Sequence, residues 1–283
     1  MRGRSEMGSN LAFWPTAALR LQCLCDTLLR DALPDPSLEA GQATCGRTAL
    51  ETVLLDAISY RPDLPQLLQA LHLETDSEGA GRVARLAADA AMVARPKALY
   101  TIAFVDEKGD DFVVIDGRRF SSRVLRVNLN EAHRVFAYVA TCGREVAQWA
   151  SGVDDLLERF WVDTIMEQAL RSALEAVGED VERRFAPGPT SDMNPGSLPD
   201  WPMAEQQPLF ALLGDPEAAI GVSLSDSYLM VPIKSVSGLR FPTSTRFSSC
   251  QLCPRPRCPG RRAEYDAELF EKRYRSTSGG SAQ

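Results

Sequence analysis

The chain has 283 residues, of which 45% are hydrophobic and 24% charged, so it is long enough to bury the core of one large domain or two small ones. A formal net charge of −7 argues against nucleic acid as a partner, because neutralising phosphates requires a concentrated basic surface. No apolar stretch approaches the roughly 20 residues that span a bilayer, so we expect no membrane partner. Seven cysteines without the dense spacing of a secreted disulfide scaffold favour a reducing compartment, and we place the protein in the cytoplasm.

The N-terminal third is predicted to be helical. Apolar residues recur at helical spacing over residues 38–71, where Pro62 and Pro65 divide two helices. A further helix is predicted over residues 81–94 and ends before Pro96, since the residue before a proline avoids helical geometry. This part of the chain should therefore pack as helices against whatever follows it.

The next segment is predicted to form strands. Residues 99–105 and 112–115 are rich in β-branched and aromatic side chains and flank a polar turn at Gly109, a pattern typical of a hairpin. Residues 121–129 and 135–140 add two more predicted strands. We expect a sheet with helices packed on it.

The longest helix is predicted over residues 153–181, with one continuous apolar stripe. Carboxylates stand at the edges of that stripe, at Glu167, Glu175 and Glu179. A solvated carboxylate is the usual state of such residues, although one that faces a groove is placed to bind a cationic ligand group.

An irregular segment follows the long helix. Residues 185–202 are rich in proline and glycine, and long ordered loops in compact domains tend to carry function. A short helix is predicted over 204–213, and residues 220–241 are predicted to form two strands separated near 232–234. Beyond that break, small residues such as Gly238 allow the backbone to approach another group closely.

Four short motifs occur in a fixed order in the second half of the chain. They are Arg184-Phe185-Ala186-Pro187-Gly188, the apolar helix end at residues 209–213, residues 221–232, and Ser235-Val236-Ser237-Gly238. In order and approximate spacing they resemble the activation domain of vitamin B12-dependent methionine synthase, over about residues 150–241, and residues 98–149 are compatible with it. The resemblance implies an α+β fold, with a mixed, mainly antiparallel twisted sheet flanked by helices.

The resemblance also implies a function. The activation domain binds S-adenosylmethionine and presents it to an oxidised cobalamin, which a methyl group and one electron return to methylcobalamin. No cobalamin-binding module is discernible in this sequence, so the cobalamin is expected on a partner, either a corrinoid protein or a cobalamin-dependent methyltransferase. An electron donor protein is a further expected partner. The resemblance leaves open whether the chain is itself an enzyme, and no catalytic residue is assigned.

Four residues carry the ligand contacts that the resemblance implies. Arg184 matches the arginine that clamps the ligand carboxylate, and Ala186 matches the position whose backbone contacts the adenine. Gly188 holds that loop open, and Glu175 lies closest to the glutamate that meets the ligand ammonium. Without the resemblance, Arg184 is a cation at the end of a helix, where it favours the helix dipole.

The sequence departs from the family pattern at two places. The family has a tyrosine after its Arg-x-Ala-Pro-Gly motif, whereas this chain has Pro189 and then a second Pro-Gly pair at Pro195 and Gly196. It also has adjacent tyrosines downstream, where this chain has Ser248 and Ser249 followed by cysteine. Ligand contacts made by those rings are therefore not expected here.

Three cysteines cluster near the C-terminus, at Cys250, Cys253 and Cys258. Three thiolates within nine residues can chelate a metal, and both an iron–sulfur cluster and zinc suit this spacing. A fourth ligand is expected from Cys142 or Cys45, and free thiols are the alternative. The cluster supports a second function, a non-catalytic metal-binding or redox module that docks on a corrinoid protein.

These observations divide the chain into four parts. We expect a flexible N-terminal tail over residues 1–20, a helical region over 21–97, an activation-domain-like region over 98–245, and a cysteine-rich segment with a C-terminal tail over 246–283.

Overall fold

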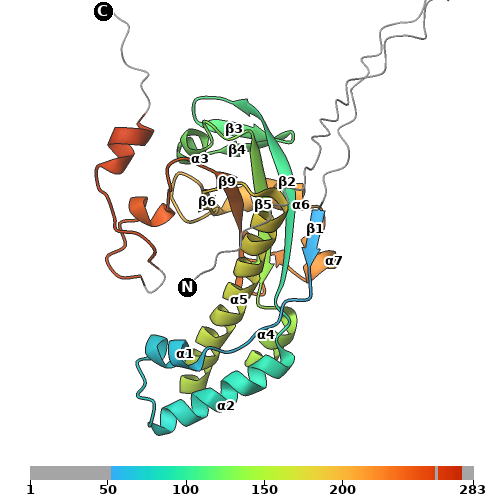
Figure 1. Cartoon of the computed structure of the whole chain (residues 1–283), viewed down its shortest axis with the longest axis vertical. Coiled ribbons are helices and arrows are strands. Elements are labelled where there is room, and N and C mark those ends of the chain that lie inside the picture. Colours follow the sequence, from blue (N-terminus) through green and yellow to red (C-terminus); the bar gives the residue numbers. More distant parts are fainter. Residues whose placement is uncertain (1–51, 259–260, 276–283) are drawn as a thin grey trace, which may run out of the picture. The chain divides into compact units, whose positions relative to one another are not determined.

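The computed structural model describes residues 52–258 and 261–275, which lie in one compact unit built on an antiparallel sheet (Figure 1). The sheet has seven strands in the order β4-β3-β2-β5-β9-β6, with β1 paired to a further part of β2. The strands are β1 (Thr52–Leu55), β2 (Lys97–Lys108), β3 (Phe112–Ile115), β4 (Arg118–Ser121), β5 (Arg134–Thr141), β6 (Thr190–Met193) and β9 (Ser235–Pro242). A separate two-stranded ribbon joins β7 (Ser223–Leu224) and β8 (Met230–Val231).

Helices cover both faces of the sheet. One face carries α1 (Leu64–Leu71), α2 (Glu78–Val93), α4 (Arg144–Ser151) and α5 (Leu156–Phe185), and the other carries α3 (Arg123–Asn128), α6 (Gln206–Leu213) and α7 (Pro216–Ile220). Strand β5 is central and buried on both sides, because Phe136 and Tyr138 point to the α5 side while Ala137 and Val139 point to the other. This α+β arrangement confirms the predicted fold class.

Helix α5 is the longest element. It confirms the helix predicted over residues 153–181, although it begins three residues later, at Leu156. Asp155 caps its first turn by accepting from the Glu158 N–H, and Ala186 ends it in a left-handed conformation. Buried residues at a spacing of four, such as Ile165, Ala169 and Ala173, form its core-facing stripe. Its N-terminal half contacts α1 and α2, and its C-terminal half lies along the sheet (Figure 1).

A buried carboxylate ties α5 to the sheet. The Asp180 side chain is only 6% exposed and accepts a 2.6 Å hydrogen bond from Tyr100 Oη of β2. Arg184 Nε lies 2.8 Å from the same oxygen, Oδ2, and Arg183 pairs with the other oxygen, Oδ1. Burial, the largest influence, opposes ionisation, but the bonds from Tyr100 and Arg184 and the two arginine charges together lower the pKa of Asp180. The ionised carboxylate is therefore compensated in the folded state.

Two predicted elements are wrong. Part of the predicted helix over residues 38–71 is instead strand β1, because the free edge of β2 pairs with Thr52–Leu55 and Val53 is buried there. The strand predicted over residues 121–129 is replaced by α3, because the Ser122 hydroxyl accepts from the Leu125 N–H and starts a helix. Local periodicity was ambiguous at both places, and tertiary pairing and capping decided the outcome.

The proline- and glycine-rich segment over residues 185–202 contains a strand that the sequence did not predict. Strand β6 pairs with β9, and the chain then turns back to bury Trp201 completely beside Phe120. The Asp200 carboxylate accepts from the Ser122 hydroxyl and from the Val124 N–H 2.9 Å away, which fastens the loop to the start of α3. The helix predicted over 204–213 and the break near 232–234 are confirmed.

Several predictions fall outside the described part of the chain: the tail at residues 1–20, the first part (21–51) of the helical region predicted over 21–97, which includes Cys45, and residues 259–260 and 276–283 of the C-terminal segment. Helices α1 and α2 pack on α5, and β1 belongs to the main sheet. Within residues 52–258 and 261–275, no helix is both long enough and apolar enough to cross a membrane.

The Asp180 contact predicts a pH-dependent stability. Because the folded-state pKa lies below the ordinary value of about 3.9, ionised Asp180 stabilises the fold at neutral pH, and this contribution is lost as the pH falls through the folded pKa, below about pH 4. Tyr100→Phe should lower the unfolding free energy by about 1–3 kcal/mol at pH 7 and by less in acid. Urea unfolding of the wild type and the variant at pH 7 and below about pH 4 measures this difference in unfolding free energy.

The matched control is Tyr60→Phe, which removes a buried hydrogen bond from Tyr60 to the uncharged Gln168 on the same helix. Its cost should be similar at the two pH values. An equal pH dependence in the two variants would contradict the role given to Asp180.

Candidate functional site

A groove of about 910 Å³ lies between α5 and β9 and is here called the α5–β9 groove. Helix α5 forms one wall with Glu167, Arg171, Glu175 and Gly178, and β9 forms the floor with its residues 235–237 and 240. The remaining wall comes from residues 194–197 after β6, from Met203 and Gln206, from residues 230, 233 and 234, and from Arg261 and Arg262.

The floor of the groove is an open strand edge. Strand β6 pairs with β9 only from Leu239 to Pro242, so in the described chain no strand neighbours residues 235–238 on that side. Asn194 Nδ2 takes the place of a strand there and donates to the Ser237 carbonyl at 2.8 Å. Gly238 is required, because a Cβ at this position would lie 2.6 Å from the Met193 carbonyl and 2.9 Å from Tyr138 Oη.

A buried polar network supports this edge. Asn194 Nδ2 also donates to Tyr138 Oη at 2.9 Å, and burial raises the pKa of the Tyr138 phenol, which keeps it neutral. Ser237 Oγ donates to Gln206 Oε1 at 3.1 Å, and Gln206 Nε2 donates to the Tyr228 carbonyl at 3.1 Å. The groove floor is therefore preorganised, and its fully buried Gln206 is satisfied on both sides of its amide.

An ion pair closes the end of the open edge. Arg240 of β9 and Asp192 of β6 stand directly opposite each other and form two hydrogen bonds of 2.8 and 3.0 Å. The guanidinium lies against α5 at Gly178, where an added Cβ would be 2.9 Å from Nη1. A glycine inside a helix is costly, and this close approach is the physical reason for it.

The groove carries both signs of charge. Arg171 is 3.4 Å from Glu167, and Lys234 is 2.8 Å from Asp163, so two cations of the wall are already paired. Glu175 has no hydrogen-bond or ion-pair partner among the described residues and projects from the same wall. With the open backbone edge, the groove can bind a ligand that has a cationic group and a flat polar ring.

The predicted ligand residues lie in two places. Glu175 lines the groove, whereas Arg184, Ala186 and Gly188 are not among its lining residues. Arg184 is held by Asp180, Ala186 ends α5 with φ 39°, and Gly188 has φ 73°. The second Pro-Gly pair of the chain, at residues 195–196, lines the groove instead. The sequence analysis noted that pair only as a departure from the family pattern and gave it no ligand role, although its repetition of the Pro-Gly motif was the available signal.

The predicted metal ligands are not gathered into a site. Cys250 and Cys253 lie on a single 3₁₀ turn (Ser249–Leu252 and its cap), both half-buried, and Cys258 is exposed. Among residues 52–258 and 261–275, no three His, Cys, Asp or Glu side chains are placed to hold a metal ion. Arg261 occupies the middle of this cysteine loop and donates at 3.3 Å to the carbonyls of both Cys250 and Cys253.

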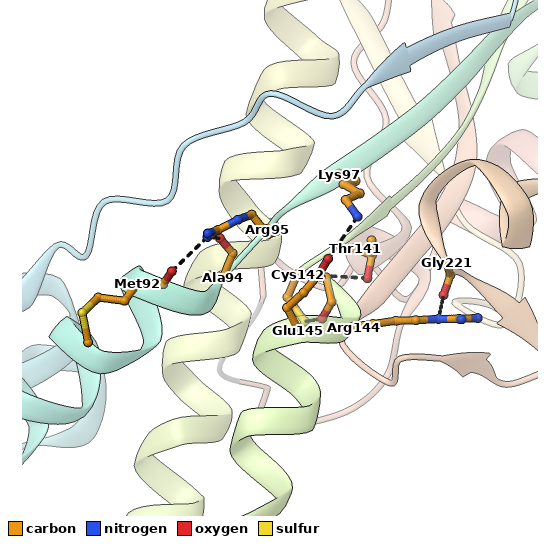
Figure 2. A network of polar contacts seen from close by, with 10 residues as sticks. Met92, Ala94, Arg95, Lys97, Thr141, Cys142, Arg144, Glu145 and Gly221 are labelled. Atoms are coloured by element: carbon orange, nitrogen blue, oxygen red, sulfur yellow. Dashed lines mark hydrogen bonds and ion pairs between the residues drawn. The ribbon is translucent and has the colours of Figure 1, made fainter.

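Cys142, one of the two expected fourth ligands, lies apart from that loop at the β5–α4 turn (Figure 2). It is completely buried, and burial raises the pKa of its thiol to about 12. Its neighbours in the turn are held by Lys97 pairing with Glu145 at 3.2 Å and by Arg144 Nε donating to the Gly221 carbonyl at 2.6 Å (Figure 2). The structure therefore presents Cys142 as an inert core residue.

The comparison with known proteins rests on structure. No family model matches the sequence, and no curated protein matches it. The fold is similar to that in a crystal structure of the MetH reactivation domain bound to AdoHcy, with a TM-score of 0.50 and 16% sequence identity, over 71% of this chain and 81% of that chain. The chain therefore has an activation-domain-like fold, a mainly antiparallel sheet flanked by helices.

Because Gly178 contacts Arg240, we expect Gly178→Ala to lower the stability of the fold, whereas the same substitution elsewhere in a helix raises it. Gly→Ala inside a helix ordinarily stabilises by about 0.5–1 kcal/mol. Gly178→Ala should instead destabilise by about 1–2 kcal/mol, because the methyl group displaces the Arg240 guanidinium from Asp192. Thermal or urea unfolding measures the sign.

Gly81→Ala in α2 is the matched control, because an added Cβ meets nothing within 4 Å there. That variant should gain stability. A gain of similar size at Gly178 would show that Arg240 moves aside without loss and that the pair does not depend on the glycine.

Proposed function

We propose that the α5–β9 groove binds S-adenosylmethionine and that the protein assists the reductive methylation of a corrinoid carried by a partner. The observation that carries the proposal is the open edge of β9 beside the unpaired Glu175, on a fold similar to that of the MetH reactivation domain, whose crystal structure holds AdoHcy. The groove volume of about 910 Å³ is within the range of small-molecule sites.

The chemistry of the groove suits the parts of this ligand. Glu175 offers a carboxylate to the ligand ammonium, a charge-assisted pairing. The β9 edge at residues 235–237 offers backbone groups to the adenine edge, and Leu170, Leu174 and Met230 offer apolar surface to its faces. A nucleoside with a charged amino-acid tail therefore finds complementary groups along the whole groove.

The ligand carboxylate has two candidate partners. The resemblance assigns it to Arg184, which is 40% exposed but already bound to Asp180 outside the groove lining. Within the groove, Arg261 presents a guanidinium anchored by backbone carbonyls. Its two terminal nitrogens already donate to four backbone carbonyls, so this guanidinium would meet a carboxylate through its charge and its Nε–H.

Apolar side chains at the mouth of the groove support a docking partner. Ile233 lines the groove and is 85% exposed, and its neighbours Leu229 and Val231 are 55% and 50% exposed. Lys234 pairs with Asp163 and so links this ribbon to the start of α5, where Leu156 is 82% exposed. Exposed apolar surface of this kind marks interaction sites, and we assign this one to the corrinoid protein.

In the proposed reaction the corrinoid on the partner accepts the methyl group of the sulfonium, and a separate donor protein supplies one electron. The groove's part is to hold the ligand by its two ends and leave the sulfonium methyl accessible. Correct placement of the two reactants lowers the barrier by removing the cost of bringing them together.

Calorimetry with S-adenosylmethionine tests the assignment of Glu175. Glu175→Gln should weaken binding by about tenfold or more, because it removes one charge-assisted hydrogen bond to the ammonium. Glu179→Gln is the matched control, since it changes the same charge one turn further along α5 on a residue that does not line the groove. Absence of binding by the wild type would overturn the proposal, and equal losses would remove Glu175 from it.

The same titration decides the carboxylate partner. Arg184→Gln should weaken binding if the resemblance is correct, and Arg183→Gln, which changes the other arginine on Asp180, controls for effects on that buried carboxylate. Loss only in Arg261→Gln would give the role to the groove's own guanidinium.

A second candidate function, the metal-binding or redox module, is favoured by one observation, the placement of Cys250 and Cys253 on a single turn. If it is correct, protein purified without oxygen should contain iron or zinc and, for an iron–sulfur cluster, absorb visible light. Cys253→Ser should lose that metal, whereas Cys142→Ser, a change at a buried cysteine outside the loop, should keep it. A metal-free, colourless wild type would contradict this candidate.

A further inference from the structure

A second, smaller cleft adjoins the α5–β9 groove. It encloses about 360 Å³ between β6 and the segment that follows β9, here called the β6–248 cleft, and its walls include Ser191, Arg246, Ser248, Gln251 and Arg262. Arg262 and Asp192 line both cavities, so the cleft and the groove meet at these two residues.

Two exposed arginines, Arg246 and Arg262, line the cleft. Neither Arg246 nor Arg262 has an ion pair among the described residues. The carboxylate of the cleft, Asp192, is already engaged through both oxygens by Arg240, at 2.8 and 3.0 Å. Two guanidinium groups that line one cleft create a local positive potential, and this potential favours a bound anion. The chain as a whole has a charge of −7, which makes this local excess of positive charge unusual.

The uncharged groups of the cleft are also arranged as donors. Ser191 is buried and its Oγ accepts from the Phe247 N–H at 2.8 Å, and Ser248 Oγ accepts from the Cys250 N–H at 3.3 Å. In the described chain no hydrogen bond donated by Ser191 Oγ occurs, so this hydroxyl retains its proton for a ligand, whereas the Ser248 hydroxyl is engaged by the Cys250 thiol.

Gln251 also offers a hydrogen-bond donor to the cleft. Its Oε1 accepts from the Ser248 N–H at 2.9 Å in a capping box, which fixes the orientation of the side-chain amide and leaves the NH₂ group available. The cleft therefore offers two guanidinium groups, the Ser191 hydroxyl proton and the Gln251 NH₂ group, while the Asp192 carboxylate is occupied by Arg240.

We propose that the β6–248 cleft binds a phosphate oxyanion, either inorganic phosphate or the phosphoryl group of a larger ligand. A phosphate carries between one and two negative charges at neutral pH and distributes its oxygens tetrahedrally, which matches two cations and donors that come from different sides. A carboxylate has fewer oxygens and one charge, and would leave part of the donor set unused. The assignment does not depend on the ligand of the α5–β9 groove.

Titration calorimetry with inorganic phosphate at constant ionic strength tests the site. Arg246→Gln should weaken binding by about tenfold or more, since one charge-assisted contact is lost. Arg257→Gln, which removes the same charge from an exposed residue that lines neither cavity, should leave the dissociation constant unchanged. Wild-type protein that shows no saturable binding, or an equal loss in both variants, would overturn the proposal.

Gln251→Glu provides a variant that keeps the fold. The glutamate retains an oxygen for the Ser248 N–H, so the capping box and the unfolding temperature should be preserved, while a negative charge replaces the NH₂ donor. Phosphate binding should fall below detection. Unchanged binding by this folded variant would also overturn the proposal.

Adenosine 5′-monophosphate identifies the source of the phosphate. If the cleft holds the phosphoryl group of a ligand that continues into the groove, the nucleotide should bind at least tenfold more tightly than inorganic phosphate and lose that advantage in Gln251→Glu. If the natural ligand is free phosphate, the two should bind equally. Nucleotide binding that is indifferent to both Arg246→Gln and Gln251→Glu would place it elsewhere and count against the cleft.

Discussion

The candidate site depends on where strand β6 ends. Had β6 continued beyond Met193, its backbone would cover the edge of β9, and the groove floor would be an ordinary sheet interior. The chain turns away there because Asn194 exchanges backbone pairing for a side-chain bond to the Ser237 carbonyl, and the Pro-Gly pair that follows cannot continue a strand. Gly238 completes the arrangement, since only a residue without Cβ fits between Met193 and Tyr138.

The opposite wall is held by a different kind of interaction. Helix α5 runs along the sheet, and the groove exists because α5 is held at a distance from β9. Near its C-terminal end, Tyr100 and Asp180 form a buried contact that draws α5 onto β2, whereas Gly178 lets the Arg240 guanidinium occupy the space between α5 and β9. The Tyr100–Asp180 contact brings α5 close to β2, and the inserted Arg240 side chain keeps α5 apart from β9. Gly178 and Arg240 both line the groove, so one end of the groove lies at this inserted side chain.

Much of this architecture could be predicted from local sequence, and the site itself in part. The long helix over α5 follows from its apolar stripe, and the hairpin of β2 and β3 follows from its β-branched runs and polar turn. Strand β1 and helix α3 could not be predicted in the same way, because the first exists through pairing with the β2 edge and the second through the Ser122 cap and Asp200, which is 78 positions away from Ser122. Glu175 was reached through a resemblance, and the structure places it in the groove. The Pro-Gly pair at residues 195–196 was noted only as a departure from the family pattern, because only the folded chain brings it to the groove.

The cysteine loop shows how the two cavities are connected. Arg261 donates to the carbonyls of Cys250 and Cys253 and lines the groove, and the next residue, Arg262, lines both the groove and the β6–248 cleft while its N–H lies 3.4 Å from Cys250 Sγ. The loop is thus folded around a guanidinium, with backbone carbonyls directed toward that cation. Arg261 and Arg262 therefore join the cysteine loop to both cavities, Arg261 through its bonds to the backbone carbonyls and Arg262 through its N–H contact with the Cys250 thiol.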